Sequence, residues 1–419
     1  MISAAYPHAR KFILDALHLD RDLPAPAVVL EMRAEDWDCL LRTAQMHRLG
    51  PMLYHRLGGS AYADLIPRGV LEQLKAAHRK SALRSLTRYR ELVTVTRLLD
   101  AEQIPSIALK GAFLARYAYP DAGLRPMRDL DLLIKQEHAV KAFELLKEHG
   151  CRPDSDGFPE AYFADRRHLP PLKGPDGSVI ELHIRLIASD SYRTYSADFG
   201  DELWVRSVSR MIGGTRIRFL CIEDMMLHLC IHATLEHQFD LGPLALVDIA
   251  LLVDTQQIDW PNFIRVVCDD NWQRPVLPVL HLARQYLGAK IPDEVIQTLG
   301  GKESEATWLE SAEYLLFADF VNFNLPRDYV QRILIPGNLF ERFVTFLGIV
   351  FPPRLAIARH FPVSADSPKA FLYYPLHWLR MFAEKLPFLL KTHAGRKGAI
   401  RQLALHRKTL SDWLEEEGS

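Results

Sequence analysis

The sequence predicts an α+β protein in which a small mixed β-sheet is flanked by helical regions. Three observations support this fold class. Apolar residues recur at three- and four-residue spacing up to residue 99, short apolar runs alternate with helical patterns between residues 100 and 218, and helical periodicity returns from residue 219. We therefore divide the chain into an N-terminal helical region (1–99), a sheet core (100–218) and a C-terminal helical region (219–419).

The composition is that of an ordinary globular protein. The 419 residues include 51 basic and 52 acidic side chains, and 48% are hydrophobic, so the bulk charge indicates neither a nucleic acid nor an acidic partner. Five scattered cysteines without a CxxC pair argue against a disulfide framework and against a zinc ribbon. The N-terminus lacks a signal-peptide pattern, and no apolar run approaches the roughly 20 residues of a spanning helix. We expect a cytoplasmic protein without a transmembrane segment.

The N-terminal region carries the helical pattern in two places. Trp37, Leu40, Leu41 and Ala44 follow three- and four-residue spacing, and a second apolar series follows the same spacing nearer the core. We therefore predict a helical N-terminal module. The second series consists of Leu83, Leu86, Leu92, Val93 and Leu98.

The core region alternates between strands and helices. Residues 104–111, IPSIALKG, indicate a short buried strand that ends at a glycine, and a short helix follows at 112–119. A second strand, MRDLDLLI, covers 127–134. A helix over 137–150 then places Val140, Phe143, Leu146 and Ala139 inward and stops at Gly150. Residues 162–187 carry two further strands joined by the turn KGPDG.

The C-terminal region is predicted to be helical, and one of its helices carries an acid within an apolar segment. Asp248 lies in LALVDIALL, a segment that indicates a buried helix. Because an unpaired buried carboxylate is costly, we expect a partner, either a histidine of this region or an arginine. Such a pair would tie the helical region to the core.

Two aspartates stand on one face of the second core strand. Side chains alternate along a strand, so Asp129 and Asp131 share a face, with α-carbons roughly 7 Å apart, and Leu130 and Leu132 take the other face. Neighbouring carboxylates repel each other unless cations lie between them, and Mg²⁺ prefers such oxygen ligands. The alternative is a solvated strand face on which the aspartates pair with nearby arginines.

The segment around this pair resembles the uncharacterised nucleotidyltransferase family of the DNA polymerase beta-like superfamily. The resemblance is carried by a leucine-lysine-glycine turn, a short helix, an arginine and an aspartate-hydrophobic-aspartate strand. It implies a nucleotidyltransferase core that uses Mg²⁺ or Mn²⁺ and transfers a nucleoside monophosphate from a nucleoside triphosphate. The matching residues are Leu109, Lys110, Gly111, Arg125, Asp129 and Asp131.

The resemblance also implies roles for individual residues. Asp129 and Asp131 would bind the metal ions, and a third acid on a later strand would complete the site. Glu181 is our candidate for that acid, as a metal ligand or general base, although a charged residue on an edge strand is often only a solubility device. His183, on the same face, is a candidate for the acceptor site.

The phosphate-binding turn departs from the superfamily pattern. Lys110-Gly111-Ala112 stands where a glycine-serine turn is typical, so one hydroxyl contact with phosphate is missing. Gly111 still permits close approach of the backbone, and Lys110 and Arg125 supply positive charge to a triphosphate. Arg125 could equally be an ordinary salt-bridge partner.

The histidines of the segment LHLCIHATLEH do not form a zinc motif. His228 and His232 lie four residues apart, but Leu229 replaces the glutamate of H-E-x-x-H. We therefore expect partly buried, hydrogen-bonded helix residues, with His232 as a further candidate for the acceptor site.

The sequence supports two hypotheses about function. The first is a metal-dependent nucleotidyltransferase with ATP as the default donor and a small molecule, peptide, protein or RNA as the unidentified acceptor. The second is a catalytically silent protein of the same fold that acts as a binding or assembly partner in a biosynthetic or toxin-antitoxin system. The altered turn and the single candidate for the third acid favour the second hypothesis.

Overall fold

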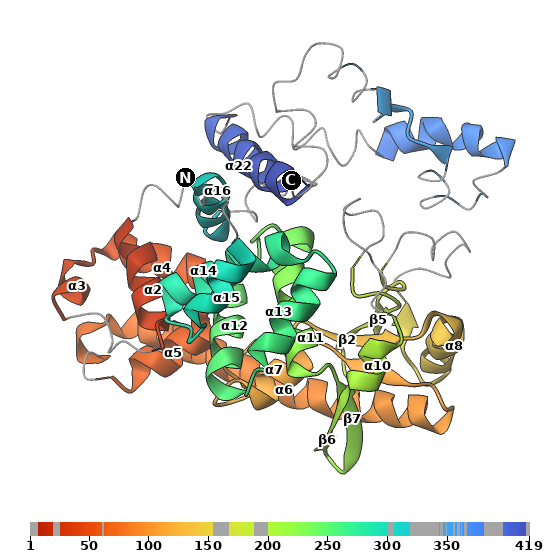
Figure 1. The fold of residues 1–419 in the computed structure, drawn as a ribbon, viewed down its shortest axis with the longest axis horizontal. Coiled ribbons are helices and arrows are strands. Elements are labelled where there is room, and N and C mark those ends of the chain that lie inside the picture. Colours follow the sequence, from red (N-terminus) through yellow and green to blue (C-terminus); the bar gives the residue numbers. More distant parts are fainter. Residues whose placement is uncertain are drawn as a thin grey trace.

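The computed structural model describes residues 7–19, 26–60, 63–153, 167–187, 200–300, 306–318, 343, 347–348, 350–354, 357, 361, 363, 367–380 and 397–415. Within these residues the fold is a mixed α/β structure with one seven-stranded sheet and flanking helices, which confirms the predicted fold class (Figure 1).

The N-terminal region is helical, as predicted. Trp37, Leu40 and Ala44 are buried, whereas Leu83 and Leu86, which follow the same helical spacing, are 68% and 70% exposed. In the same helix, α6, Ser81 and Ser85 are buried instead, and the Ser85 hydroxyl donates to the Ala122 carbonyl. The elements are α2 (Pro7–Leu17), α3 (Pro26–Glu31), α4 (Ala34–Met46), α5 (Gly50–Gly58), η1 (Ala63–Leu65) and α6 (Arg68–Ala101).

The sheet runs in the order β3-β4-β5-β2-β1-β7-β6. The central strands form a mixed arrangement, because β2 pairs parallel with β5 and antiparallel with β1, while β1 pairs parallel with β7. The edge pairs on both sides are antiparallel. The strands are β1 (Ser106–Ala108), β2 (Asp129–Ile134), β3 (Arg152–Pro153), β4 (Leu172–Lys173), β5 (Val179–His183), β6 (Val208–Ile212) and β7 (Thr215–Phe219).

Short helices connect the strands. In α8, Ala139, Phe143 and Leu146 are buried as predicted, but Val140 is 50% exposed, because the buried stripe passes through Ala142 instead. The long helix α6 packs against α8 and β7, and it runs alongside the sheet (Figure 1). The connecting elements are α7 (Gly111–Tyr117), η2 (Gln136–His138), α8 (Ala139–Glu148) and α10 (Glu202–Arg206).

The β6-β7 hairpin was not predicted strand by strand. Its turn is Gly213-Gly214, with φ of +55° and +73°, a conformation that favours glycine and matches the twist of a tight hairpin. Figure 1 shows this hairpin projecting from the body of the protein.

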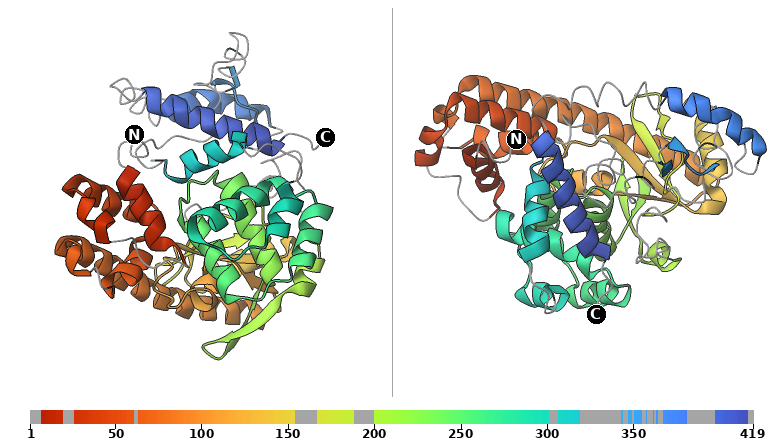
Figure 2. Two further views of the ribbon diagram at one scale, coloured as in Figure 1. Left: turned by 60° about the vertical axis from the view of Figure 1, so that its left-hand side comes forward. Right: turned by 90° about the horizontal axis from the view of Figure 1, so that it is seen from above.

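The described part of the C-terminal region is mainly helical. Figure 2 shows α16 and α22 side by side, above the helices that cover the core. The elements are α11 (Ile222–Ile231), the π-helical segment η3 (His232–Glu236), α12 (Leu244–Thr255), α13 (Trp260–Asp269), α14 (Gln273–Leu287), α15 (Asp293–Gly300), α16 (Ala306–Leu316), η4 (Pro368–Tyr373) and α22 (Lys397–Glu415).

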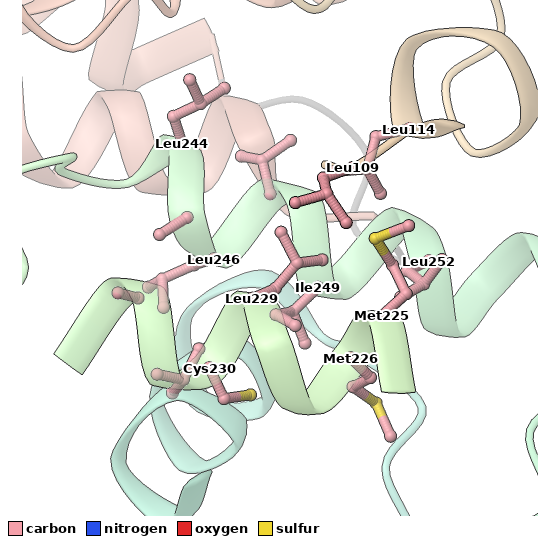
Figure 3. Packing of buried hydrophobic residues seen from close by; sticks show 14 of the residues in the cluster. Leu109, Leu114, Met225, Met226, Leu229, Cys230, Leu244, Leu246, Ile249 and Leu252 are labelled. Atoms are coloured by element: carbon pink, nitrogen blue, oxygen red, sulfur yellow. The ribbon is translucent and has the colours of Figure 1, made fainter. Parts of the chain in front are cut away.

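One apolar cluster extends through all three regions, from Phe12 to Leu414. Figure 3 shows Met225, Leu229 and Ile249 of α11 and α12 packing close to Leu109 and Leu114, on either side of the turn that follows β1. The C-terminal helices thereby fix the position of this turn. Removal of this apolar surface from water is the main force that holds them on the core.

Candidate functional site

The register of β2 and β5 brings the predicted acids together. Asp131 lies directly opposite Glu181 in this parallel pair, and Asp129 lies two residues earlier on the same face of β2. Leu130 and Leu132 point to the other face and are each 1% exposed, as the alternation predicted. Three carboxylates from two neighbouring strands therefore line one side of the sheet.

His183 completes a compact group of potential ligands. Its Nε2 lies 2.9 Å from Asp131 Oδ1 and 3.6 Å from Glu181 Oε2, and its side chain is fully buried. One ligand atom each from Asp131, Glu181 and His183 lies within 4.8 Å of the others. Two carboxylate oxygens and one imidazole nitrogen suit a divalent cation. Asp129 does not belong to this group of three.

Lys110 supplies a positive charge to the group. Its Nζ lies 3.2 Å from Asp131 Oδ2, and both side chains are almost completely buried. The Lys110 backbone has φ +45° and ψ −110°, a conformation that glycine adopts far more readily. The backbone of the turn is therefore strained at the residue whose ammonium group pairs with Asp131.

The electrostatic environment shifts the pKa values of the three acids differently. Burial opposes ionisation of Asp131, but Lys110 and His183 outweigh it and hold the pKa of Asp131 well below its ordinary value. For Asp129, burial and then the charge on Asp131 raise the pKa. The contact with His183 lowers the pKa of Glu181. Asp131 is therefore the firmly ionised member of the set.

Arg125 lies between the turn and the C-terminal helices. A Cβ at position 111 would come within 2.5 Å of Arg125 Nη1, so only glycine fits beside this guanidinium. Its Nε and Nη2 each donate to Asp248 at 2.8 Å, and the Tyr119 hydroxyl donates to the same carboxylate at 2.7 Å. The expectation that Asp248 has a partner is confirmed. Arg125 is thus a salt-bridge partner, and its role toward a triphosphate stays a prediction.

The histidines of α11 and η3 are close enough to Lys110 for its charge to act on them. His232 contacts Glu236 Oε2 through Nδ1 at 3.3 Å, as expected for a hydrogen-bonded helix residue. For His228 the expectation was wrong, because it is only 1% exposed and neither ring nitrogen has a hydrogen-bond partner among the described residues. Burial and then the positive charge on Lys110 hold the pKa of both histidines well below the ordinary value.

Two neighbours of the site were not among the sequence candidates. His168 pairs with His183 through an isolated β-bridge, and its Nε2 lies 4.0 Å from Glu181 Oε2. Arg48, between α4 and α5, is close enough for its charge to act on Arg125, Arg128 and Asp129. Arg48 carried no specific signal in the sequence, since an arginine between two helical segments is not unusual.

Comparison with known proteins identifies the family. Residues 33–288 match the model of an uncharacterised nucleotidyltransferase family. The chain belongs to this family. The match includes α4, α5, α6, the whole sheet and the helices α11 to α14, so the family pattern extends well beyond the aspartate pair.

Two further comparisons add little to the family match. A crystal structure of an antigenic nucleotidyltransferase-like protein from Paracoccidioides brasiliensis is 16% identical, covers 50% of this chain and 96% of its own, and has a TM-score of 0.29. No curated protein matches the chain.

No helix among the described residues combines the length and apolar character needed to cross a membrane.

Proposed function

We propose that this family member is a metal-dependent nucleotidyltransferase. In this proposal it transfers a nucleoside monophosphate from a nucleoside triphosphate, by default ATP, to an acceptor, and it works in the cytoplasm. The observation that carries the proposal is the register that sets Asp131 opposite Glu181, with Asp129 on the same face and His183 in contact with both members of the pair.

The donor atoms suit a divalent cation. Asp131, Glu181 and His183 would hold the ion, because their ligand atoms lie within 4.8 Å of one another. When bound, Mg²⁺ or Mn²⁺ neutralises charge on the phosphates and lowers the barrier to attack. A nitrogen ligand favours Mn²⁺ over Mg²⁺.

The chain supplies positive charge where a triphosphate would lie. Because Gly111 has no side chain, the Arg125 guanidinium lies close to the backbone of the turn, and the ammonium group of the preceding residue, Lys110, adds a second positive charge. Arg125 Nη1 faces Gly111, whereas Nε and Nη2 face Asp248. The ion pair with Asp248 therefore orients Nη1 of this guanidinium toward the turn.

The reaction would be an in-line displacement. The acceptor oxygen attacks the α-phosphorus, a new oxygen–phosphorus bond forms, the bond to the bridging oxygen breaks, and pyrophosphate leaves. The acceptor hydroxyl would lose its proton to Asp129, because this carboxylate is outside the group of three ligands and because burial and then the charge on Asp131 raise its pKa. His183 and His232 remain candidates for contacts with the acceptor.

A transfer assay tests the proposal. The protein is incubated with each labelled triphosphate, with Mg²⁺ or Mn²⁺, and with fractionated cell extract, and both pyrophosphate and transferred label are measured. We expect transfer by the wild type, a loss of at least about 100-fold in Asp129→Ala, and wild-type activity in Asp176→Ala. Asp176 is the matched control, because it lies in the β4-β5 turn and pairs with Arg90. Equal transfer by Asp129→Ala would contradict the proposal.

One observation favours the silent binding protein as the second candidate. Both cationic side chains expected to meet a triphosphate already have carboxylate partners: Lys110 pairs with Asp131 and Arg125 with Asp248. A silent protein would transfer no label with any extract fraction. When immobilised, however, it would retain a component of one fraction. The same assay, combined with capture on immobilised protein, separates the two candidates.

A further inference from the structure

A groove opens next to Asp129, on the side of the N-terminal helices. It has a volume of about 600 Å³, and it is lined by α4, α5, the first half of α6 and residues 126–128, which lead directly into β2. Lys110 and Gly111 do not line it. The groove is therefore distinct from the turn assigned to the triphosphate, yet one of its walls ends at a candidate catalytic residue.

The lining of the groove is strongly basic. Five cationic side chains face one acid, Asp38, and none of the five forms an ion pair with an acid that the structure describes. This imbalance contrasts with the near neutrality of the whole chain, which has a net charge of −1. Unpaired cations gathered in a concave site attract anions. The five are Arg42, Arg48, Lys80, Arg84 and Arg128.

The cations are arranged in a row that leads to the carboxylates. Lys80 and Arg84 lie one turn apart on α6, and Arg88, one turn further along, donates through Nη2 to the Arg128 carbonyl at 2.9 Å. Arg88 thus holds the backbone that immediately precedes Asp129. From the opposite wall, Arg48 stands close to Arg128 and Asp129.

The surroundings of Arg48 indicate an excess of positive charge. Burial, followed by the charges of Arg125 and Arg128, lowers the pKa of Arg48 to about 10, although Asp129 and Asp248 act in the opposite direction. Arg48 therefore has two cationic neighbours, of which Arg125 already pairs with Asp248. A bound anion would supply the missing negative charge.

The size and chemistry of the groove favour a small phosphate-bearing ligand. Its volume is in the range of roughly 300–1,000 Å³ that is typical of small-molecule sites. Guanidinium groups match phosphate oxygens in geometry and charge. From Lys80 to Arg88 the helix rises only about 12 Å, which is short for the track of a nucleic acid backbone.

We propose that this groove binds the acceptor of the transfer reaction and that the acceptor is a small alcohol that carries a phosphate group. The cations of α4 and α6 hold the phosphate, and the hydroxyl of the same molecule lies toward Asp129. The inference rests on the proposed function, and it names the substrate class that the function leaves open.

A binding experiment tests the inference without the transfer reaction. Ribose 5-phosphate and ribose are titrated calorimetrically into the intact protein, in the absence of triphosphate. We expect ribose 5-phosphate to bind at least about tenfold more tightly than ribose, and Arg84→Gln or Lys80→Gln to weaken that binding about tenfold. Arg79→Gln is the matched control: this exposed cation is also on α6 but outside the groove, and binding should not change.

Four outcomes would overturn the inference. The first is equal affinity for ribose and ribose 5-phosphate, and the second is equal weakening by Arg79→Gln and Arg84→Gln. The third is displacement of ribose 5-phosphate by ATP in the wild type together with loss of ATP binding in Arg84→Gln, which would make the groove the donor site. If RNA oligonucleotides bound more tightly than ribose 5-phosphate through Arg84, the acceptor would not be a small molecule.

The transfer assay separates this inference from the proposed function. With ribose 5-phosphate as acceptor, label transfer that is weakened by Arg84→Gln but not by Arg79→Gln supports both. If the groove binds phosphate-bearing ligands but no acceptor receives label, the groove is an anion site and the proposed function is contradicted. Transfer to an uncharged acceptor with no effect of Arg84→Gln removes the inference and leaves the proposed function intact.

Discussion

Arg125 and Asp248 form a two-pronged ion pair that joins the loop before β2, where Arg125 lies against Gly111, to helix α12. Nε and Nη2 of the guanidinium each lie 2.8 Å from one oxygen of the carboxylate, and Tyr119 donates a further hydrogen bond to it. Both charged side chains are largely buried, at 12% and 6% exposure. The pair therefore connects the C-terminal helices to the candidate phosphate-binding turn.

Loss of the charge on Asp248 should destabilise the fold. Asp248→Asn leaves Arg125 buried without a counter-charge, so we expect the free energy of unfolding to fall by about 3 kcal/mol in urea denaturation. Asp254→Asn is the control, because Asp254 is on the same helix and pairs with Lys290 at the surface. It should cost less than about 1 kcal/mol. Equal losses in the two variants would contradict the structural role of the buried pair.

The ammonium group of Lys110 should be replaceable in part by a metal ion. Lys110→Met leaves Asp131 with only His183 as a partner, so we expect a loss of roughly 2–3 kcal/mol of unfolding free energy in EDTA. Added Mn²⁺ should restore part of that loss, because a cation at Asp131 then stabilises the folded state by mass action. Lys135→Met, which removes a surface partner of Asp201, should show a small loss and no response to Mn²⁺. A Lys110→Met loss that Mn²⁺ leaves unchanged counts against metal binding at Asp131.

Much of the core could be predicted from the sequence because its signals are local. The alternation of Asp129, Leu130, Asp131 and Leu132 fixes which side chains share a face, whatever the rest of the chain does. The hairpin around KGPDG likewise follows from turn residues. Glu181 was a candidate third acid because of the family resemblance, but only the parallel register of β2 and β5 sets it directly opposite Asp131.

Other features depend on contacts between distant segments. The imbalance of charge in the groove arises only when α4, α6 and residues 126–128 meet, and the individual arginines look like ordinary surface residues. Leu83 and Leu86 follow the helical pattern but face solvent, because the neighbouring serines of α6 pack toward the core instead. The partner of Asp248 could be limited to a histidine or an arginine, but only the packing of α12 selects Arg125.

The imidazole of His183 should control metal preference. Its replacement in His183→Asn removes the nitrogen ligand and the contact with Asp131, so we expect Mn²⁺ affinity to fall by at least about tenfold, with a smaller change for Mg²⁺. Calorimetric titration of each metal measures both effects. His168→Asn is the control, since this ring lies 4.0 Å from Glu181 and outside the group of three ligands. Unchanged Mn²⁺ affinity in His183→Asn would show that this histidine is not a ligand.

His228 should make stability depend on pH. Burial and then Lys110 depress its folded-state pKa, so below about pH 6.5 the unfolded chain binds a proton that the folded chain does not. The free energy of unfolding should therefore fall as the pH decreases, by about 1.4 kcal/mol per pH unit for each such histidine. His228→Leu removes a buried imidazole without hydrogen-bond partners among the described residues. In urea titrations at pH 7.5 and 5.5, the slope should therefore lose the contribution of one proton. Met226→Leu, a packing change in the same helix, should alter stability but not the slope. An unchanged slope in His228→Leu would place the titrating group elsewhere.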